Sequence, residues 1–152
     1  MNIESPIVAA HSLGGIVLGS DVKLALAQSY AEGRDVRMTV YDNPGIKLHS
    51  YAIDQGVLTI NADEQGVIVS LSCQPPYRGT YKNKLWPGMS LAHIMAATQK
   101  QMLTCGALVL DGELGVYFVL PSPYDEFNYV QELPPDLILN TIYVMQRGWR
   151  GY

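Results

Sequence analysis

The chain has 152 residues, of which 48% are hydrophobic and 16% are charged, a composition that allows one well-packed core. Fourteen acidic and ten basic side chains give a formal net charge of -4, so no overall positive field attracts nucleic acid or an anionic membrane. The first apolar run has no basic residue before it and is interrupted by Pro6, His11, Ser12 and paired glycines. We therefore expect neither a signal peptide nor a membrane span, and a cytoplasmic protein.

The stretch VAAHSLGGIVLG, residues 8–19, resembles the nucleophile elbow of lipases. That elbow needs a strand, a sharp turn that carries the serine, and a following helix. Here the segment from Gly15 to Gly19 contains the β-branched residues Ile16 and Val17 and ends in glycine, which predicts extended chain rather than a helix. We interpret Ser12 as structural. A small serine hydrolase that pairs Ser12 with His49 or His93 is the alternative function.

The first helix is predicted to begin after Ser20, a favourable N-cap, and to end at Gly33. Its expected buried face consists of Val22, Ala25, Leu26 and Ser29. Alternating apolar and polar residues then predict a meander, with a turn at residues 43–45. Its strands are expected at residues 36–42, 46–52, 57–61 and 66–73.

A loop at residues 74–88 contains a basic and aromatic cluster of Tyr77, Arg78, Tyr81, Lys82, Lys84 and Trp86. Stacking of single-stranded nucleic acid on this cluster conflicts with the acidic balance of the chain. Tyrosine, tryptophan and arginine also dominate the energetic centres of protein interfaces. We therefore take Tyr77, Arg78, Tyr81 and Trp86 as candidate partner-binding residues, against the alternative that the aromatic residues only cover the end of the sheet.

The second helix is predicted to begin after Ser90 and to end at Gly106. Its expected buried side carries Leu91, Ile94, Met95, Thr98 and Met102. Two strands at residues 106–111 and 115–120 should follow, joined around Asp111 and Gly112, and a last strand is expected at residues 139–145.

The loop at residues 121–138 is acidic and aromatic, with Tyr124, Asp125, Glu126 and Phe127 as a second candidate partner-binding surface. A basic cleft on another protein would complement it. Asp125 and Glu126 as a catalytic acid pair is the weaker interpretation, because adjacent side chains point in different directions. The basic tail at residues 146–152 is interpreted as a frayed end, with a self-association arm as the alternative.

Metal, cofactor and disulfide chemistry find little support in the sequence. Cys73 and Cys105 match no zinc spacing and are expected to be buried reduced thiols, with a single disulfide between them as the alternative. His11, His49 and His93 are far apart, so we propose no metal site and no cofactor.

The chain as a whole predicts a single α+β domain over residues 1–152, with a helix packed on an antiparallel sheet in each of two halves. The halves, residues 14–73 and 86–145, are joined by a connector at residues 74–85. The segments VLGSDVKLA and WPGMSLAHI align on a shared glycine at the start of each helix. This pattern resembles the tandem fold of the beta-lactamase inhibitor protein family, and the resemblance implies a scaffold that presents a protein-binding surface.

We therefore expect a protein-binding module rather than an enzyme, specifically a cytoplasmic bacterial immunity or inhibitor protein. It would place one of the two aromatic loops, or the exposed sheet face, over the active site of a toxin or enzyme. Its expected partner is another protein, not nucleic acid or a membrane. A structural subunit that forms a homo-oligomer is a third interpretation.

Overall fold

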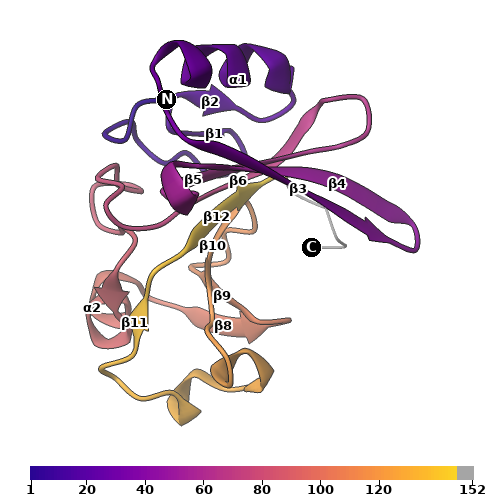
Figure 1. Ribbon diagram of the computed structural model, residues 1–152. Helices are drawn as coiled ribbons and strands as arrows, with labels where there is room; N and C mark the ends of the chain where they lie inside the picture. The colour runs from indigo at the N-terminus through magenta and orange to yellow at the C-terminus, as the bar shows by residue number, and fades with distance from the viewer. Residues whose placement is uncertain (147–152) are drawn as a thin grey trace.

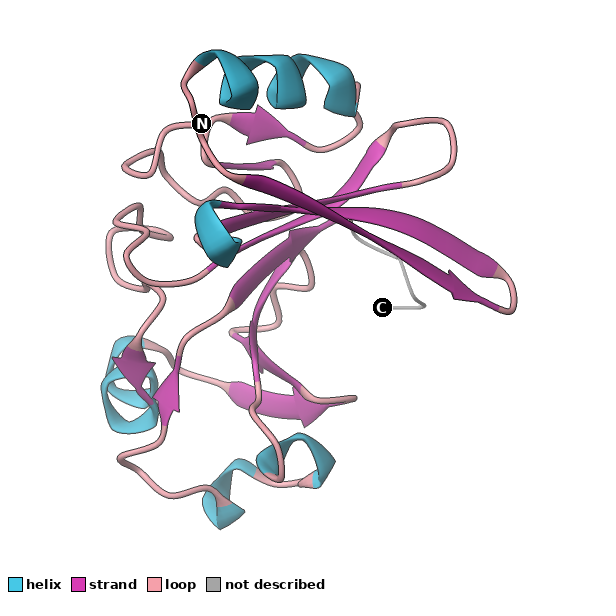
Figure 2. Ribbon diagram, in the orientation of Figure 1, coloured by secondary structure: helices cyan, strands magenta, loops and turns pink. Residues whose placement is uncertain are grey.

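The computed structural model describes residues 1–146, which form one large antiparallel sheet, a helix in each part of the chain, and connecting loops (Figures 1 and 2). The helices are α1 (Val22–Ala31) and α2 (Leu91–Ala97), with short 3-10 turns η1 (Asp54–Gly56), η2 (Tyr124–Glu126) and η3 (Val130–Glu132). The prediction of a frayed or self-associating tail concerns residues 147–152 and lies outside the described residues.

The large sheet has eight strands in the order β3-β4-β5-β6-β12-β10-β9-β8, all neighbours antiparallel. The strands are β3 (Val36–Asn43), β4 (Ile46–Ile53), β5 (Leu58–Ala62), β6 (Ile68–Cys73), β12 (Ile142–Met145), β10 (Val116–Val119), β9 (Ala107–Leu110) and β8 (Gln101–Thr104). Two small sheets pair β1 (Ser12–Leu13) with β2 (Ile16–Val17) and β7 (Met89–Ser90) with β11 (Ile138–Leu139). The predicted α+β class with an antiparallel sheet is confirmed.

The strand order follows the chain from both edges inward. Strands β3 to β6 run from one edge to the middle, and β8, β9, β10 and β12 run from the other edge to the middle, where β6 pairs with β12. One apolar core lies on the side of the curved sheet that α1, α2 and the long loops cover (Figure 1). Alternate residues such as Leu58, Ile60 and Leu71 point into this core and are fully buried.

Helix α1 begins one residue later than predicted. The side chain of Asp21, not of Ser20, accepts a hydrogen bond from the backbone N–H of Lys23 at 2.9 Å and caps the helix. The hydroxyl of Ser20 instead donates to the carbonyl of Val17 at 2.6 Å, which holds it in the preceding turn. Val22 and Ser29 are buried, as expected for the inner face.

Helix α2 is shorter than predicted, and this prediction was wrong at its C-terminal end. Ser90 caps the helix as expected, but the backbone turns extended at Thr98 and residues Gln101–Thr104 form the edge strand β8. Met102 lies opposite Val109 in β9 and is 52% exposed, because strand pairing replaces the helical face that its spacing suggested. Met95 is also exposed.

The predicted turns are confirmed in part. Residues 44 and 45 connect β3 to β4 as expected, and Gly45 has the positive φ that this turn requires. The tightest turn of the second half lies instead at Cys105 and Gly106, between β8 and β9, where both residues have positive φ. Asp111 and Gly112 begin a longer connection to β10.

The cysteines have different environments. Cys73 is fully buried in the core, and burial raises the pKa of its thiol to about 12. Cys105 is exposed, so the expectation of a buried thiol is wrong there, because the residue occupies a turn at the sheet edge. Both cysteines are free thiols. None of the helices in the described part of the chain is long and apolar enough to cross a membrane.

Candidate functional site

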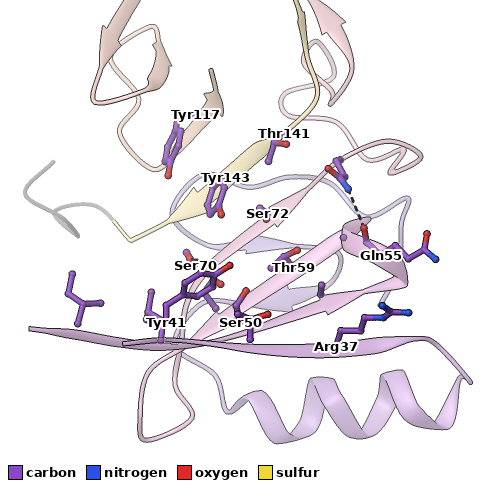
Figure 3. Close-up of a pocket in the computed structure, with 17 residues that line it drawn as sticks. Arg37, Tyr41, Ser50, Gln55, Thr59, Ser70, Ser72, Tyr117, Thr141 and Tyr143 are labelled. Carbon is purple, nitrogen blue, oxygen red and sulfur yellow. Dashed lines mark hydrogen bonds between the residues drawn. The ribbon is translucent and has the colours of Figure 1, made fainter. Parts of the chain in front are cut away.

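The face of the large sheet opposite the core carries a pocket of about 770 Å³, which we call the sheet pocket (Figure 3). Its walls come from β3, β4, β5, β6, β10 and β12, together with η1 and the residues just after β6 and just before β12. Nine lining residues carry hydroxyl groups: Thr39, Tyr41, Ser50, Thr59, Ser70, Ser72, Tyr117, Thr141 and Tyr143. The others are the amides Gln55, Asn61 and Gln74, the cation Arg37, and the apolar residues Ile46, Leu48, Ala52 and Gly56.

The alternation of the central strands produces this polar face. In β5, Leu58 and Ile60 point into the core, so Thr59 and Asn61 point into the sheet pocket. The same period places Ser70 and Ser72 of β6 on the pocket side. Strands β5 and β6 therefore each have one apolar face toward the core and one polar face toward the sheet pocket.

The floor of the sheet pocket is polar and already paired within the protein. Ser70 is 1% exposed and Asn61 is 8% exposed, and the amide Nδ2 of Asn61 donates to the hydroxyl of Ser70 at 2.9 Å. At one end of the pocket the amide of Gln74 donates to the backbone carbonyl of Gln55 at 3.4 Å (Figure 3). These internal contacts fix the lining side chains before any partner arrives.

A pair of tyrosines forms one wall of the sheet pocket. Tyr117 of β10 lies directly opposite Tyr143 of β12, with ring centroids 5.5 Å apart and ring planes 4° apart. This stacked geometry is favourable for aromatic rings. Figure 3 shows both side chains on the pocket side of their strands, so they offer flat apolar faces beside hydroxyl groups.

One of the residues that line the sheet pocket carries a full charge. Arg37 is the charged side chain among the lining residues, and its Nε lies 3.2 Å from the carboxylate of Asp35 at the exposed rim. The remaining lining groups donate and accept hydrogen bonds in neutral form. The arrangement can bind polar surface by hydrogen bonding and stacking.

The structure places most of the first predicted partner-binding loop inside the fold. Tyr77 is 4% exposed and Tyr81 is 7% exposed, so the expectation that these two side chains face a partner is corrected. The hydroxyl of Tyr77 donates to the carbonyl of Ser5 at 2.6 Å and accepts from the N–H of Gly14 at 2.9 Å. Burial raises the pKa of this phenol to about 12.

The other members of that loop point in different directions. Arg78 is exposed and lies 3.6 Å from the carboxylate of Glu4. Trp86 is half-buried against the core and makes an edge-to-face contact with His93, with ring centroids 5.2 Å apart. Lys84 lies 3.7 Å from the carboxylate of Asp111. The basic and aromatic residues of this loop therefore do not form one surface.

The second predicted loop is divided between core and solvent. Tyr124 and Phe127 pack partly against the core and meet edge to face at 5.4 Å, whereas Asp125 and Glu126 are exposed in η2. The acidic pair is thus available to a partner, and its two neighbouring rings anchor the loop.

Ser12 lies in a small hairpin, as the prediction of extended chain required. Residues Ser12 and Leu13 pair with Val17 and Ile16, and α1 begins only at Val22. Gly14 forms the turn with positive φ, and a side chain there would collide with Leu58 in the core. Gly14 of the lipase-like stretch therefore serves packing and the turn.

Histidines and acidic residues do not gather into a metal site in the described residues, where no group of three metal-ligating side chains occurs. His11 and His93 are exposed, and His49 is half-buried on β4.

The sequence suggested the exposed sheet face as a binding surface but did not identify the residues of the sheet pocket. Its signal is present in IVSLSC and LTINA, where serine, threonine and asparagine alternate with buried aliphatic residues. Alternation identified the strands, but a pocket lined by six strands becomes visible only when the strand order is known.

Comparisons with known proteins show a likeness in fold. Neither a family model nor a curated protein matches the chain. The crystal structure of the uncharacterized protein yfeY from Escherichia coli matches with a TM-score of 0.60 and 11% sequence identity, over 91% of this chain and 99% of that chain. At this identity the likeness concerns the α+β fold alone. The resemblance to the beta-lactamase inhibitor protein family stays a prediction, because these comparisons do not test it.

Proposed function

We propose that the protein is a binding module that recognises another protein through the sheet pocket. The observation that carries this proposal is the pocket itself, a preorganised polar hollow with the stacked pair of Tyr117 and Tyr143 as one wall. It replaces the two aromatic loops as the main candidate surface, since Tyr77 and Tyr81 are buried.

The chemistry of the lining residues supports binding to a protein surface. The centres of protein interfaces are depleted in charged residues and enriched in tyrosine and arginine. The sheet pocket has three tyrosines, one arginine and many hydroxyl and amide groups. Such groups match the backbone amides and polar side chains of a loop that enters the pocket.

We further propose that binding inhibits the partner, which would be an enzyme or a toxin neutralised by an immunity protein. A loop from the rim of the partner's active site would enter the sheet pocket, and the surrounding strands would cover that active site. Arg37 at the pocket rim favours a partner loop that carries a carboxylate.

We also infer that the two halves of the chain are versions of one structural unit. Each half contributes a helix followed by four strands that run from an edge of the large sheet to its middle. The equivalent positions of the helix caps, Asp21 and Ser90, agree with this inference. It predicts that residues 14–73 and 86–145 superimpose, and a different helix packing in the two halves would contradict it.

The binding proposal is tested by comparing which proteins the wild type and two variants capture from a lysate of the native host. Thr59→Arg places a long cation in the sheet pocket, and Ala27→Arg adds the same side chain to the exposed face of α1. Proteins captured by the wild type and by Ala27→Arg, but lost with Thr59→Arg, are candidate partners. The affinity of a purified candidate should fall by at least about tenfold with Thr59→Arg, because the added cation clashes and is desolvated.

Two further outcomes decide between surfaces. If Thr59→Arg captures the same proteins as the wild type, the sheet pocket is not the recognition surface. If the double variant Asp125→Lys/Glu126→Lys loses the captured proteins while Thr59→Arg still captures them, recognition belongs to the acidic loop instead. If the captured partner is an enzyme, its activity on its own substrate is then measured with and without a saturating amount of this protein. Unchanged activity in the saturated complex would contradict the inhibitor role.

A further inference from the structure

Strand β3 is a long, regular edge of the large sheet that lacks most of the usual protection against pairing. It has eight residues and pairs with β4 in an unbroken register from Val36 opposite Ile53 to Asn43 opposite Ile46. Edge strands are commonly protected by proline, by charged side chains, especially lysine, by a bulge or by short length. β3 contains no proline, lysine or bulge, although it carries Arg37 and Asp42, and each residue from 37 to 42 is exposed. The opposite edge, β8, is only four residues long. Neighbouring elements contact both edges, α1 and η1 at β3 and η3 at β8.

The backbone groups that β3 directs outward can be identified from the hydrogen bonds at its start. The N–H of Asp54 donates to the carbonyl of Asp35 at 2.8 Å, so this opposite pair is hydrogen-bonded. Hydrogen-bonded pairs alternate along an antiparallel ladder, so the backbone N–H and carbonyl groups of Arg37, Thr39 and Tyr41 point toward β4. The N–H and carbonyl groups of the alternate residues 36, 38, 40 and 42 therefore point away from the sheet, toward the open edge.

We propose that β3 is a self-association edge, which pairs antiparallel with β3 of a second copy in the register that places Thr39 opposite Thr39. In this register the outward groups of Met38 meet those of Val40 of the second copy, so both strands satisfy their free hydrogen-bonding groups. Arg37 lies opposite Tyr41 of the second copy in a pair whose side chains are close.

The side chains at this edge complement themselves in the proposed register. Met38 is 58% exposed and Val40 is 45% exposed, and each would cover the other across the interface. Arg37 would lie beside the ring of Tyr41, which is 52% exposed, in a cation–π arrangement. The proposed register places the half-buried Val36 opposite Asp42 of the second copy. The register centred on Val40 would instead separate Met38 from Val40 of the second copy and place the more exposed Met38 opposite Asp42.

Charge does not oppose this pairing. The protein carries a net charge of -4, but β3 contains one cation, Arg37, and one anion, Asp42. Two copies of the strand therefore meet without like-charge repulsion along the edge. Since Arg37, Thr39 and Tyr41 also line the sheet pocket, the dimer would join the two pockets into one continuous surface.

The proposal goes beyond the proposed function, and two matched double variants test it. Met38→Lys/Val40→Lys places lysine opposite lysine at both symmetric positions, whereas Met38→Lys/Val40→Glu places lysine opposite glutamate. All altered side chains are exposed, so both variants should fold. Sedimentation is measured from about 1 μM to about 1 mM protein. The wild type should approach twice the mass of 16.7 kDa.

We expect the lysine–lysine variant to raise the dissociation constant of the dimer at least about tenfold relative to the lysine–glutamate variant. A wild type that stays monomeric over the whole range overturns the proposal. Equal dissociation constants for the two double variants would also overturn it, because the dimer would then use another surface.

Cross-linking checks the register. Two opposite residues of a non-hydrogen-bonded pair have Cα atoms about 4.5 Å apart, within the reach of a disulfide. In a Cys105→Ser background, which removes the exposed native thiol, Thr39→Cys should oxidise to a covalent dimer. Asp42→Cys, exposed on the same strand but distant from its copy in this register, should not. Faster cross-linking of Val40→Cys than of Thr39→Cys would overturn the Thr39-centred register.

Discussion

Tyr77 illustrates how one side chain can hold a distant segment in place. Its hydroxyl joins the N-terminal segment at Ser5 to the turn at Gly14, both more than sixty residues away in sequence. Gly79 is packed just as closely, because a Cβ there would collide with the carbonyl oxygen of Ser5 and the ring of Tyr77. The segment around Tyr77 and Gly79 therefore holds the N-terminal residues in place.

We predict that Tyr77→Phe lowers the free energy of unfolding by about 1–3 kcal/mol. The phenyl ring still fills its place, but the carbonyl of Ser5 and the N–H of Gly14 lose their partner in a buried site. Urea titration measures the change. Tyr30→Phe, at a tyrosine that is 62% exposed, is the control and should leave stability unchanged. Equal midpoints for both variants would show that the hydroxyl of Tyr77 contributes nothing.

The same residue predicts a loss of stability at alkaline pH. Burial raises the pKa of Tyr77 from 10.0 to about 12, so the fold favours the neutral phenol. Its contribution is complete below the unfolded pKa and is lost as pH rises through the folded value. A shift of this size is worth up to about 3 kcal/mol.

Urea titrations at about pH 8 and about pH 11 test this prediction. The wild type should lose more stability between the two conditions than Tyr77→Phe. The buried thiol of Cys73, with its pKa also raised to about 12, should still destabilise both proteins. An identical loss in the two proteins would contradict the assignment to Tyr77.

At the scale of elements, two aspartates fix where segments begin and end. Asp21 caps α1. Asp111 accepts hydrogen bonds from the backbone N–H groups of Gln99 and Lys100 at 2.7 and 2.8 Å, which ties the β9–β10 connection to the segment between α2 and β8. Both roles depend on a carboxylate that meets free backbone donors.

We predict that Asp21→Ala destabilises the protein by about 1 kcal/mol, the usual cost of losing an N-cap. Ser20→Ala should cost less, because its hydroxyl contacts only the carbonyl of Val17. Thermal unfolding followed by circular dichroism compares the two. A larger loss for Ser20→Ala would mean that serine is the functional cap in solution.

Asp111 should make the protein sensitive to acid. Hydrogen bonds from the backbone N–H groups of Lys100 and Gln99, with Lys84 nearby, lower the pKa of this carboxyl below its ordinary value of 3.8. A lowered pKa contributes stability above the unfolded value, and this contribution disappears as pH falls through the folded value. Asp111→Ala should therefore differ from the wild type near neutral pH and converge with it in acid.

Acid titrations of unfolding check this, with the exposed Asp136→Ala as the matched control. A constant difference between Asp111→Ala and the wild type at all pH values would contradict a role for the ionised carboxylate.

At the scale of the whole molecule, the fold is one sheet with unequal faces and unequal edges. Its middle strands, β6 and β12, are buried between neighbours on both sides, whereas the hairpin of β3 and β4 carries exposed side chains over most of its length. Regions with few buried apolar contacts open with a lower free energy. Local stability should therefore fall from the middle of the sheet toward β3.

Hydrogen exchange of the backbone amides tests this gradient. We expect the slowest exchange in β6 and β12 and faster exchange at the tip of the β3–β4 hairpin. At high protein concentration, pairing of two β3 edges should slow exchange of the amides of Met38 and Val40 selectively. Uniform protection along the whole sheet would contradict the gradient.

The sequence alone determined the elements whose signals are local. Alternation located β3, β4, β5, β6, β9, β10 and β12, and Ser90 marked the start of α2. The extended chain after Ser12 also followed from its β-branched residues. These predictions depend on neighbouring residues and backbone preferences, which the sequence states directly.

The tertiary structure alone decided what depends on distant partners. Residues 101–104 continue a helical spacing but pair with β9. Tyr77 is of a residue type that is common at protein interfaces, but its hydroxyl forms hydrogen bonds with Ser5 and Gly14. The sheet pocket and the open edge of β3 exist because of the strand order, which brings together residues from opposite ends of the chain. Burial and strand pairing are properties of the assembled sheet, so a local pattern does not specify them.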